Sequence, residues 1–177
     1  MSIASAVISQ VGKQGTRRKY REALVALLSK YQGAQYDDPG EFGEVSGVRS
    51  PTGPVEAGEM YFFNYIATKP QKLKYYDQYP VTYVINVDSF GFFGANLHYL
   101  APKLREGVAK SLLNSGDGII VPDRTLHRYY FGGVQGKLLR VPESEMSDVS
   151  LLPTEEFIKV ETGKRFPSYR VWRGDKI

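Results

Sequence analysis

Residues 91–100, GFFGANLHYL, decide the fold of this chain of 177 residues. They follow the apolar run 80–88, PVTYVINVD, whose alternating side chains are typical of a strand. Residues 88–91, DSFG, have the composition of a tight turn in which Gly91 can adopt a positive φ. Gly94 indicates a bulge or a tight bend. We therefore predict two antiparallel strands, the second running through 91–100, that curl into a small β-structure.

The histidine in this stretch has a structural and a catalytic interpretation. His98 shares its predicted strand face with Asn96, and a lone histidine in a strand is more often a structural hydrogen-bonding residue. The second histidine, His127, is 29 positions away, and neither has a histidine or carboxylate neighbour at metal-ligand spacing. We therefore expect no catalytic histidine, no metal site and no cofactor.

Helices are predicted on both sides of the strands. Thr16 can cap a helix through 17–31, and Gly33 is expected to end it. One side of this helix is apolar, and the other carries Arg18, Arg21, Glu22 and Ser29. Further helices are expected to start at Pro102 and Pro153.

The remaining segments are expected to be strands, loops and a tail. Residues 32–58 have no period and are rich in glycine, proline and acidic residues, which predicts a long loop. Residues 59–65, EMYFFNY, carry aromatic side chains on both faces, so this strand should be covered on both sides. Together these elements predict an α+β fold: a small SH3-like antiparallel β-barrel with an N-terminal helix, a capping helix after the third strand and short C-terminal helices.

The charge distribution divides the chain into three parts. Residues 1–31 carry a net charge of +5, residues 32–158 carry −5, and residues 159–177 carry +4. We accordingly divide the chain into a basic helix with an acidic loop (1–57), a β-barrel core with helices (58–158) and a basic aromatic tail (159–177). Flexible, solvated ends would explain the same distribution, but basic ends on an acidic body also fit arms that bind an acidic partner or a phosphate backbone.

Candidate binding residues come from both basic ends. The tail, KRFPSYRVWR, combines cations with aromatic rings, which suits base stacking and also suits anchors in protein interfaces. The predicted partner- or nucleic-acid-binding residues are Arg17, Arg18, Lys19, Arg21, Lys164, Arg165, Tyr169, Arg170, Trp172 and Arg173.

Several classes of protein are disfavoured. The chain has no cysteine, which excludes disulfides and thiolate metal sites, and no apolar run approaches the roughly 20 residues of a membrane span. Phosphate-binding glycine loops and nucleophile elbows are absent from the sequence. The pair Asp37 and Asp38 could hold a divalent ion but is better explained as a turn. An enzyme is therefore the weaker hypothesis.

Part of the chain resembles a known family. The stretches 75–80 (YYDQYP), 91–100, 102–105 (PKLR) and 152–157 (LPTEEF) resemble a pattern shared by virion and hypothetical proteins of T-even-like, contractile-tailed bacteriophages and cyanophages. The match covers residues 58–158. It implies a virion protein assembled in the host cytoplasm, in multiple copies and in contact with other phage structural proteins. It carries no catalytic residues.

Three functional hypotheses follow. The first is a structural protein of the tail, baseplate or head–tail junction of such a virion, without enzymatic activity and without a membrane. The second is a DNA-binding protein acting at packaged genome ends. The third is a toxin-type endoribonuclease on an SH3-like barrel, for which Lys69, Lys72 and Thr82 are the candidate residues.

Overall fold

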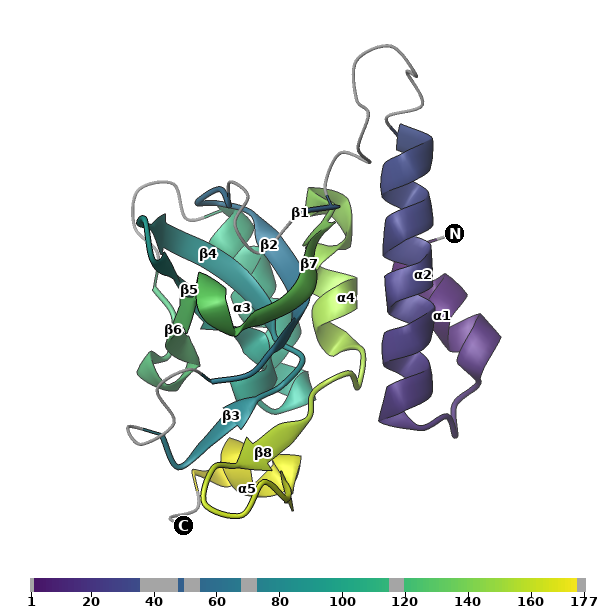
Figure 1. Cartoon of the computed structure of the whole chain (residues 1–177). Coiled ribbons are helices and arrows are strands. Elements are labelled where there is room, and N and C mark those ends of the chain that lie inside the picture. Colours follow the sequence, from purple (N-terminus) through teal and green to yellow (C-terminus); the bar gives the residue numbers. More distant parts are fainter. Residues whose placement is uncertain (1, 36–47, 50–54, 68–72, 115–119, 175–177) are drawn as a thin grey trace.

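The computed structural model describes residues 2–35, 48–49, 55–67, 73–114 and 120–174 (Figure 1). The α-helices of this part are Ile3–Val11 (α1), Arg17–Gln35 (α2), Pro102–Asn114 (α3), Met146–Leu151 (α4) and Ser168–Arg173 (α5). Its strands are Val48–Arg49 (β1), Met60–Tyr65 (β2), Tyr75–Asp77 (β3), Val81–Val87 (β4), Gly91–Asn96 (β5), Leu126–Tyr130 (β6), Val134–Val141 (β7), Phe157–Lys159 (β8) and Arg165–Phe166 (β9). Short 3-10 helices occupy Leu97–Tyr99 (η2), Asp123–Thr125 (η3), Phe131–Gly133 (η4) and Glu143–Glu145 (η5).

The strands form two antiparallel sheets, so the α+β class is confirmed. Five strands follow the order β7-β2-β4-β5-β6, and the two-residue β1 extends the β7 edge. A second sheet has the order β3-β8-β9. Strands β6 and β7 lie at opposite ends of the five-strand order, yet the three residues of η4 join them. A flat sheet would separate these ends by about 19 Å, more than such a link spans, so the sheet must curl.

The curled sheet does not close into the expected barrel within the described residues. Strand β6 pairs only with β5, and β7 pairs with β2 and β1, so no ladder joins β6 to β7. The chain crosses between them through η4, where Ile66 N donates to Gly133 O at 2.8 Å. The crossing segment therefore takes the place of the hydrogen bonds that would close a barrel.

Both faces of β2 are covered, as its aromatic pattern predicted. Met60 and Phe62 pack in a cluster with residues of α1–α4, whereas Tyr61, Phe63 and Tyr65 pack inside the curl of the sheet. Figure 1 shows α4 and α2 beyond the β7 edge and α3 behind the sheet. A third cluster joins the small sheet to α5.

The predicted turn between β4 and β5 is present, but the reason why position 91 is a glycine differs from the predicted one. Asp88 Oδ1 accepts hydrogen bonds from the backbone of Phe90 and Gly91 at 2.8 and 3.1 Å. Gly91 does not adopt a positive φ. Instead, its Cα lies so close to the Tyr129 carbonyl of β6 that any Cβ would overlap it. The glycine is required by the approach of the next strand.

The second predicted strand is shorter than expected. It ends at Asn96, because the Asn96 side chain accepts a hydrogen bond from His98 N at 3.0 Å and starts the 3-10 helix η2. The irregularity predicted at Gly94 lies opposite, in β4, where the pairing register shifts between Val84 and Asn86.

The N-terminal region contains a helix that was not predicted. Ser2 caps α1 by accepting a hydrogen bond from Ser5 N, and Gly12, with φ of 80°, ends it. In α2, Thr16 caps the start as expected, but the helix continues two residues beyond Gly33. A glycine in the last turn costs about 1 kcal/mol, which the packing of a 19-residue helix tolerates.

The C-terminal predictions were partly wrong. Residues 153–156 do not form a helix from Pro153 but lead into β8. The basic tail is not an arm in its described part. It forms β9 and α5, where Val171 is buried and the indole nitrogen of Trp172 donates to His98 O at 2.9 Å.

We predict that Gly91→Ala lowers the free energy of unfolding by about 2–3 kcal/mol, because its methyl group overpacks the β5–β6 ladder. Urea denaturation followed by the fluorescence of Trp172, the one tryptophan of the chain, measures this change. The matched control is Gly107→Ala in α3, where nothing lies within 4 Å of a new Cβ and stability should rise by about 0.5–1 kcal/mol. Equal stabilities for the two variants would contradict the close approach at Gly91.

Candidate functional site

The carboxylate of Asp77 is the centre of a buried polar network. Its Oδ2 accepts hydrogen bonds from His98 Nδ1 at 2.7 Å and from Asn96 Nδ2 at 3.0 Å. Its Oδ1 accepts from the backbone nitrogens of Tyr79 and Glu156, both at 3.1 Å. Asp77, Asn96 and His98 are all buried. Each carboxylate oxygen therefore holds two hydrogen bonds.

The electrostatics of Asp77 favour its ionised form. Burial by itself would raise its pKa, but the interaction with His98 and the hydrogen bonds from His98, Asn96 and the Glu156 backbone outweigh it. The pKa of Asp77 consequently lies below its usual value. The other ring nitrogen of His98, Nε2, lies 3.2 Å from Thr154 Oγ1, so both nitrogens of this histidine have a partner.

A buried arginine extends this network to the helices. Arg105 of α3 donates from Nε to Leu100 O at 2.8 Å and from Nη1 to Ser150 O at 3.2 Å. Its Nη1 also lies 3.6 Å from the buried carboxylate of Glu155. Buried polar residues from each of the stretches 75–80, 91–100, 102–105 and 152–157 are thus brought together inside the protein.

A cavity of about 190 Å³ lies beside Asp77 and is lined mainly by tyrosines. Burial raises the pKa of Tyr99 and of Tyr129, so both hydroxyls stay protonated at neutral pH. Burial also lowers the pKa of His127, whose Nε2 donates to Arg124 O at 2.9 Å. The rings of Tyr99 and His127 stack with their centroids 3.9 Å apart, so these groups pack together at the cavity wall.

Four of the predicted binding residues meet at one place on the surface. Arg17, Arg18 and Arg21 come from the first turns of α2, and Arg165 comes from β9. Arg21 and Arg165 both contact Glu156, each at 2.7 Å. The two basic ends of the sequence therefore converge, because α2 and β9 both contact Glu156.

Ion pairs hold the other two arginines. Arg18 Nε lies 2.8 Å from Glu22 Oε1, one turn along α2, and Arg17 lies 3.3 Å from the buried Glu155. The Arg21 guanidinium also stacks on the Tyr79 ring at 4.1 Å. Arg18 and Arg165 remain the most exposed, with 79% of each side chain accessible.

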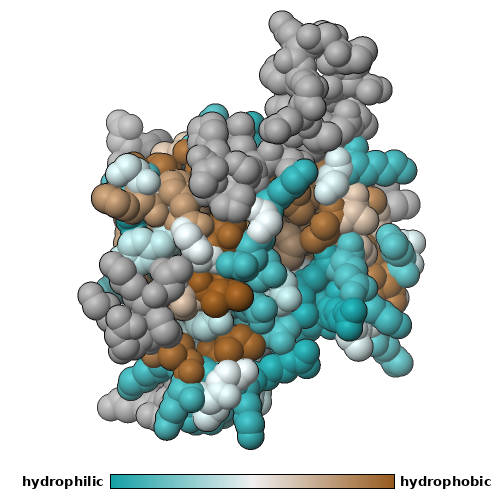
Figure 2. All heavy atoms as spheres, viewed as in Figure 1, coloured by the Kyte–Doolittle hydropathy of each residue, from teal (hydrophilic) through white to brown (hydrophobic). Residues whose placement is uncertain are grey.

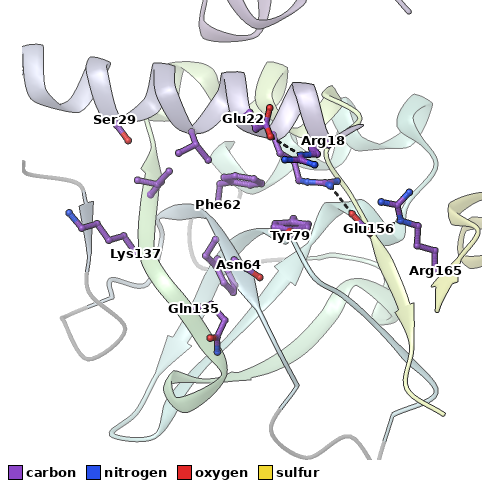
Figure 3. A pocket seen from close by; sticks show the side chains of 14 residues that line it. Arg18, Glu22, Ser29, Phe62, Asn64, Tyr79, Gln135, Lys137, Glu156 and Arg165 are labelled. Atoms are coloured by element: carbon purple, nitrogen blue, oxygen red, sulfur yellow. Dashed lines mark hydrogen bonds and ion pairs between the residues drawn. The ribbon is translucent and has the colours of Figure 1, made fainter. Parts of the chain in front are cut away.

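Arg18, Arg21 and Arg165, but not Arg17, border a groove of about 790 Å³ between α2 and the β2–β7 sheet face (Figure 3). Figure 3 shows Arg18 and Glu22 pointing from α2 over Phe62 and Tyr79, with Asn64 and Gln135 farther along the sheet. In the view of Figure 1, hydrophilic side chains gather over the lower half of α2 and the space beside it (Figure 2). We call this site the arginine groove. Its lining residues are Arg18, Arg21, Glu22, Val25, Ser29, Phe62, Phe63, Asn64, Tyr79, Gln135, Lys137, Leu139, Glu156 and Arg165.

The other predicted residues do not line the arginine groove. Lys19 and Lys164 are exposed elsewhere. The tail residues stack within α5 and β9 instead: Arg170 lies over Phe166, and Arg173 lies over the exposed Tyr169. Trp172 binds the protein's own core.

Sequence patterns did not reveal the floor of the groove. Asn64, Gln135 and Lys137 lie in or near predicted strands, and only the pairing of β2 with β7 brings them together. Asp37, Asp38, Lys69 and Lys72 lie outside the described residues. Thr82, a candidate ribonuclease residue, is fully buried.

Searches of the described residues find no group of three or more potential metal-ligating side chains. They also find no helix with the length and apolarity that crossing a bilayer requires. Comparisons with protein-family models, with curated proteins and with solved structures give no significant match.

We predict that Asp77→Asn lowers the free energy of unfolding by about 3 kcal/mol at pH 7, because it removes one charge of a buried hydrogen-bonded pair. Since folding depresses the pKa of Asp77, this stabilisation is present above the unfolded-state value of about 3.9 and is lost as the pH falls through the folded-state value. The difference between wild type and variant should therefore shrink below about pH 4.

Urea denaturation from pH 7 down to pH 3 measures this dependence. The control is Asp123→Asn, at an exposed position of η3, which should change stability by less than about 0.5 kcal/mol. A constant difference across the pH range would show that Asp77 is not ionised in the folded protein.

Proposed function

We propose that this protein is a structural and assembly component of a contractile-tailed bacteriophage virion, in the tail, baseplate or head–tail junction, without enzymatic activity. One observation carries the proposal. Asp77, Asn96 and His98, from stretches that resemble the phage family, are buried and hydrogen-bonded to one another, and the buried Arg105 donates to backbone carbonyls beside them. The resemblance therefore includes residues whose hydrogen bonds are made within the protein, as suits a scaffold.

The finer architecture that we propose is an SH3-like barrel that is open between β6 and β7. The order β7-β2-β4-β5-β6 and the 3-10 crossing from β6 to β7 support it. A helix after β5, α3, would cap this body as the sequence predicted. A rigid body of this kind suits a protein that is present in several copies and holds neighbouring subunits.

The arginine groove is the surface that we propose for contact with a neighbouring phage protein. It is the place where the exposed guanidinium groups of Arg18 and Arg165 come together. Arginine is favoured in protein interfaces because its planar group binds carboxylates through two parallel hydrogen bonds.

A second candidate function is DNA binding at packaged genome ends. The observation that favours it is the same gathering of exposed arginines with Lys137. Against it, Glu22 and Glu156 lie among these cations and would repel phosphates. A toxin-type ribonuclease has less support, because the Thr82 hydroxyl is buried.

We predict that the protein is an integral component of purified particles of the phage that encodes it. Quantitative mass spectrometry of density-gradient particles should find it at a fixed ratio to the tail proteins, and crosslinking should join it to one of them. A phage-encoded enzyme from the same lysate serves as the contamination control. Recovery of the protein at or below the level of this enzyme would contradict the proposal.

DNA binding has a separate test. If the second candidate is correct, fluorescence anisotropy with a blunt duplex should show an affinity that falls at least tenfold between 50 and 200 mM salt, as expected for several phosphate contacts. Arg18→Glu with Arg165→Glu should reduce both the affinity and the salt dependence. Absence of binding at 50 mM salt would dismiss this candidate.

A further inference from the structure

One wall of the arginine groove is a single side of α2. Arg18, Glu22, Val25 and Ser29 follow one another at spacings of four, three and four residues, so they form one stripe along the helix. The apolar stripe, with Leu24 and Leu28, is buried in the cluster that also holds Phe62 of β2. The groove therefore runs along the flank of α2, beside the apolar contact between this helix and the sheet.

The floor of the groove is one face of the β2–β7 pair. Phe62 is paired in register with Leu139, and Asn64 is paired with Gln135. Helices cover this sheet face over Phe62 and Leu139. They do not cover it over Asn64 and Gln135, which line the groove. The floor thus offers two side-chain amides, and the adjoining wall offers the exposed Val25 of α2, a combination that suits an extended polypeptide.

An unpartnered polar atom lies in this floor. Asn64 Oδ1 is buried and accepts no hydrogen bond from any described residue. A buried acceptor of this kind is satisfied by a donor, and a backbone N–H is the donor that every polypeptide brings. A phosphodiester backbone offers only acceptors.

The rim of the groove is electropositive. Four cationic side chains line it against the two carboxylates of Glu22 and Glu156. Arg18 and Arg165 each use only Nε in their contacts with described residues, so their terminal nitrogens face outward. These two guanidinium groups can each bind a carboxylate side-on.

We propose that the arginine groove binds an extended acidic segment of a neighbouring protein. Its main chain lies beside Asn64, an apolar side chain packs on the exposed Val25 of α2, and its carboxylates bind Arg18 and Arg165. The inference rests on the proposed function only for the identity of the neighbour as a phage protein. The ligand preference belongs to the groove itself.

The test uses the full chain and a fluorescein-labelled ten-residue peptide in which Glu and Phe alternate. Fluorescence anisotropy should show saturable binding, and the matched peptide with Lys in place of Glu should bind at least tenfold more weakly. The double variant Arg18→Glu/Arg165→Glu should lose at least tenfold in affinity for the acidic peptide. The control Lys13→Glu/Lys103→Glu, with the same charge change at exposed lysines outside the groove, should keep it.

A further variant separates binding from folding. Asn64→Leu removes the unpartnered buried acceptor, so its melting temperature should be equal to or above that of wild type while its peptide affinity falls several-fold. Equal binding of both peptides, or unchanged binding by the arginine variant, would overturn the proposal. Groove-dependent binding of a ten-nucleotide single-stranded DNA without peptide binding would instead assign the groove to nucleic acid. Absence of the protein from particles would leave the peptide result unchanged and would refute only the proposed function.

Discussion

The buried carboxylate of Asp77 holds together segments that are far apart in the sequence. Removing a carboxylate from water costs several kcal/mol, and this cost is offset only when its oxygens are fully hydrogen-bonded. Here the donors come from the end of β5, from η2, from the turn after β3 and from Glu156, just before β8. If one segment shifts, the charge loses a donor in a dry site. The arrangement of the two sheets therefore depends on the buried charge of Asp77.

The same network makes the C-terminal segment part of the body. The carbonyl of His98 accepts the indole N–H of Trp172, and Arg105 stacks on the Trp172 ring at 5.3 Å. Once α5 is docked there, Arg165 lies within reach of Glu156, and Glu156 also holds Arg21 of α2. Three consecutive residues thus connect the core with the arginine groove. Thr154 contacts His98, Glu155 contacts Arg105, and Glu156 binds Arg21 in the groove.

Local patterns in the sequence predicted the elements whose causes are local. The alternation in β2 and β4, the turn at Asp88, the cap at Thr16 and the start of α3 at Pro102 were all confirmed. The sequence did not reveal elements that depend on tertiary contacts, such as β3 and β9. Residues 153–156 have a proline and acidic residues suited to a first helical turn, yet Glu155 and Glu156 form ion pairs with α2 and no helix forms there. Predicting the groove would have required the β2–β7 register, which turn chemistry does not specify.

Native-state hydrogen exchange tests the central role of Asp77 most directly. The amide hydrogens of Tyr79 and Glu156 bond to its Oδ1, outside any sheet ladder, while that of His98 bonds to Asn96. If the carboxylate holds the fold together, these three amides should exchange only through global unfolding, with the same free energy as the slowest amides of β2 and β4. Exchange of Tyr79 and Glu156 through a local opening, while β2 and β4 stay protected, would show that the fold persists without this network.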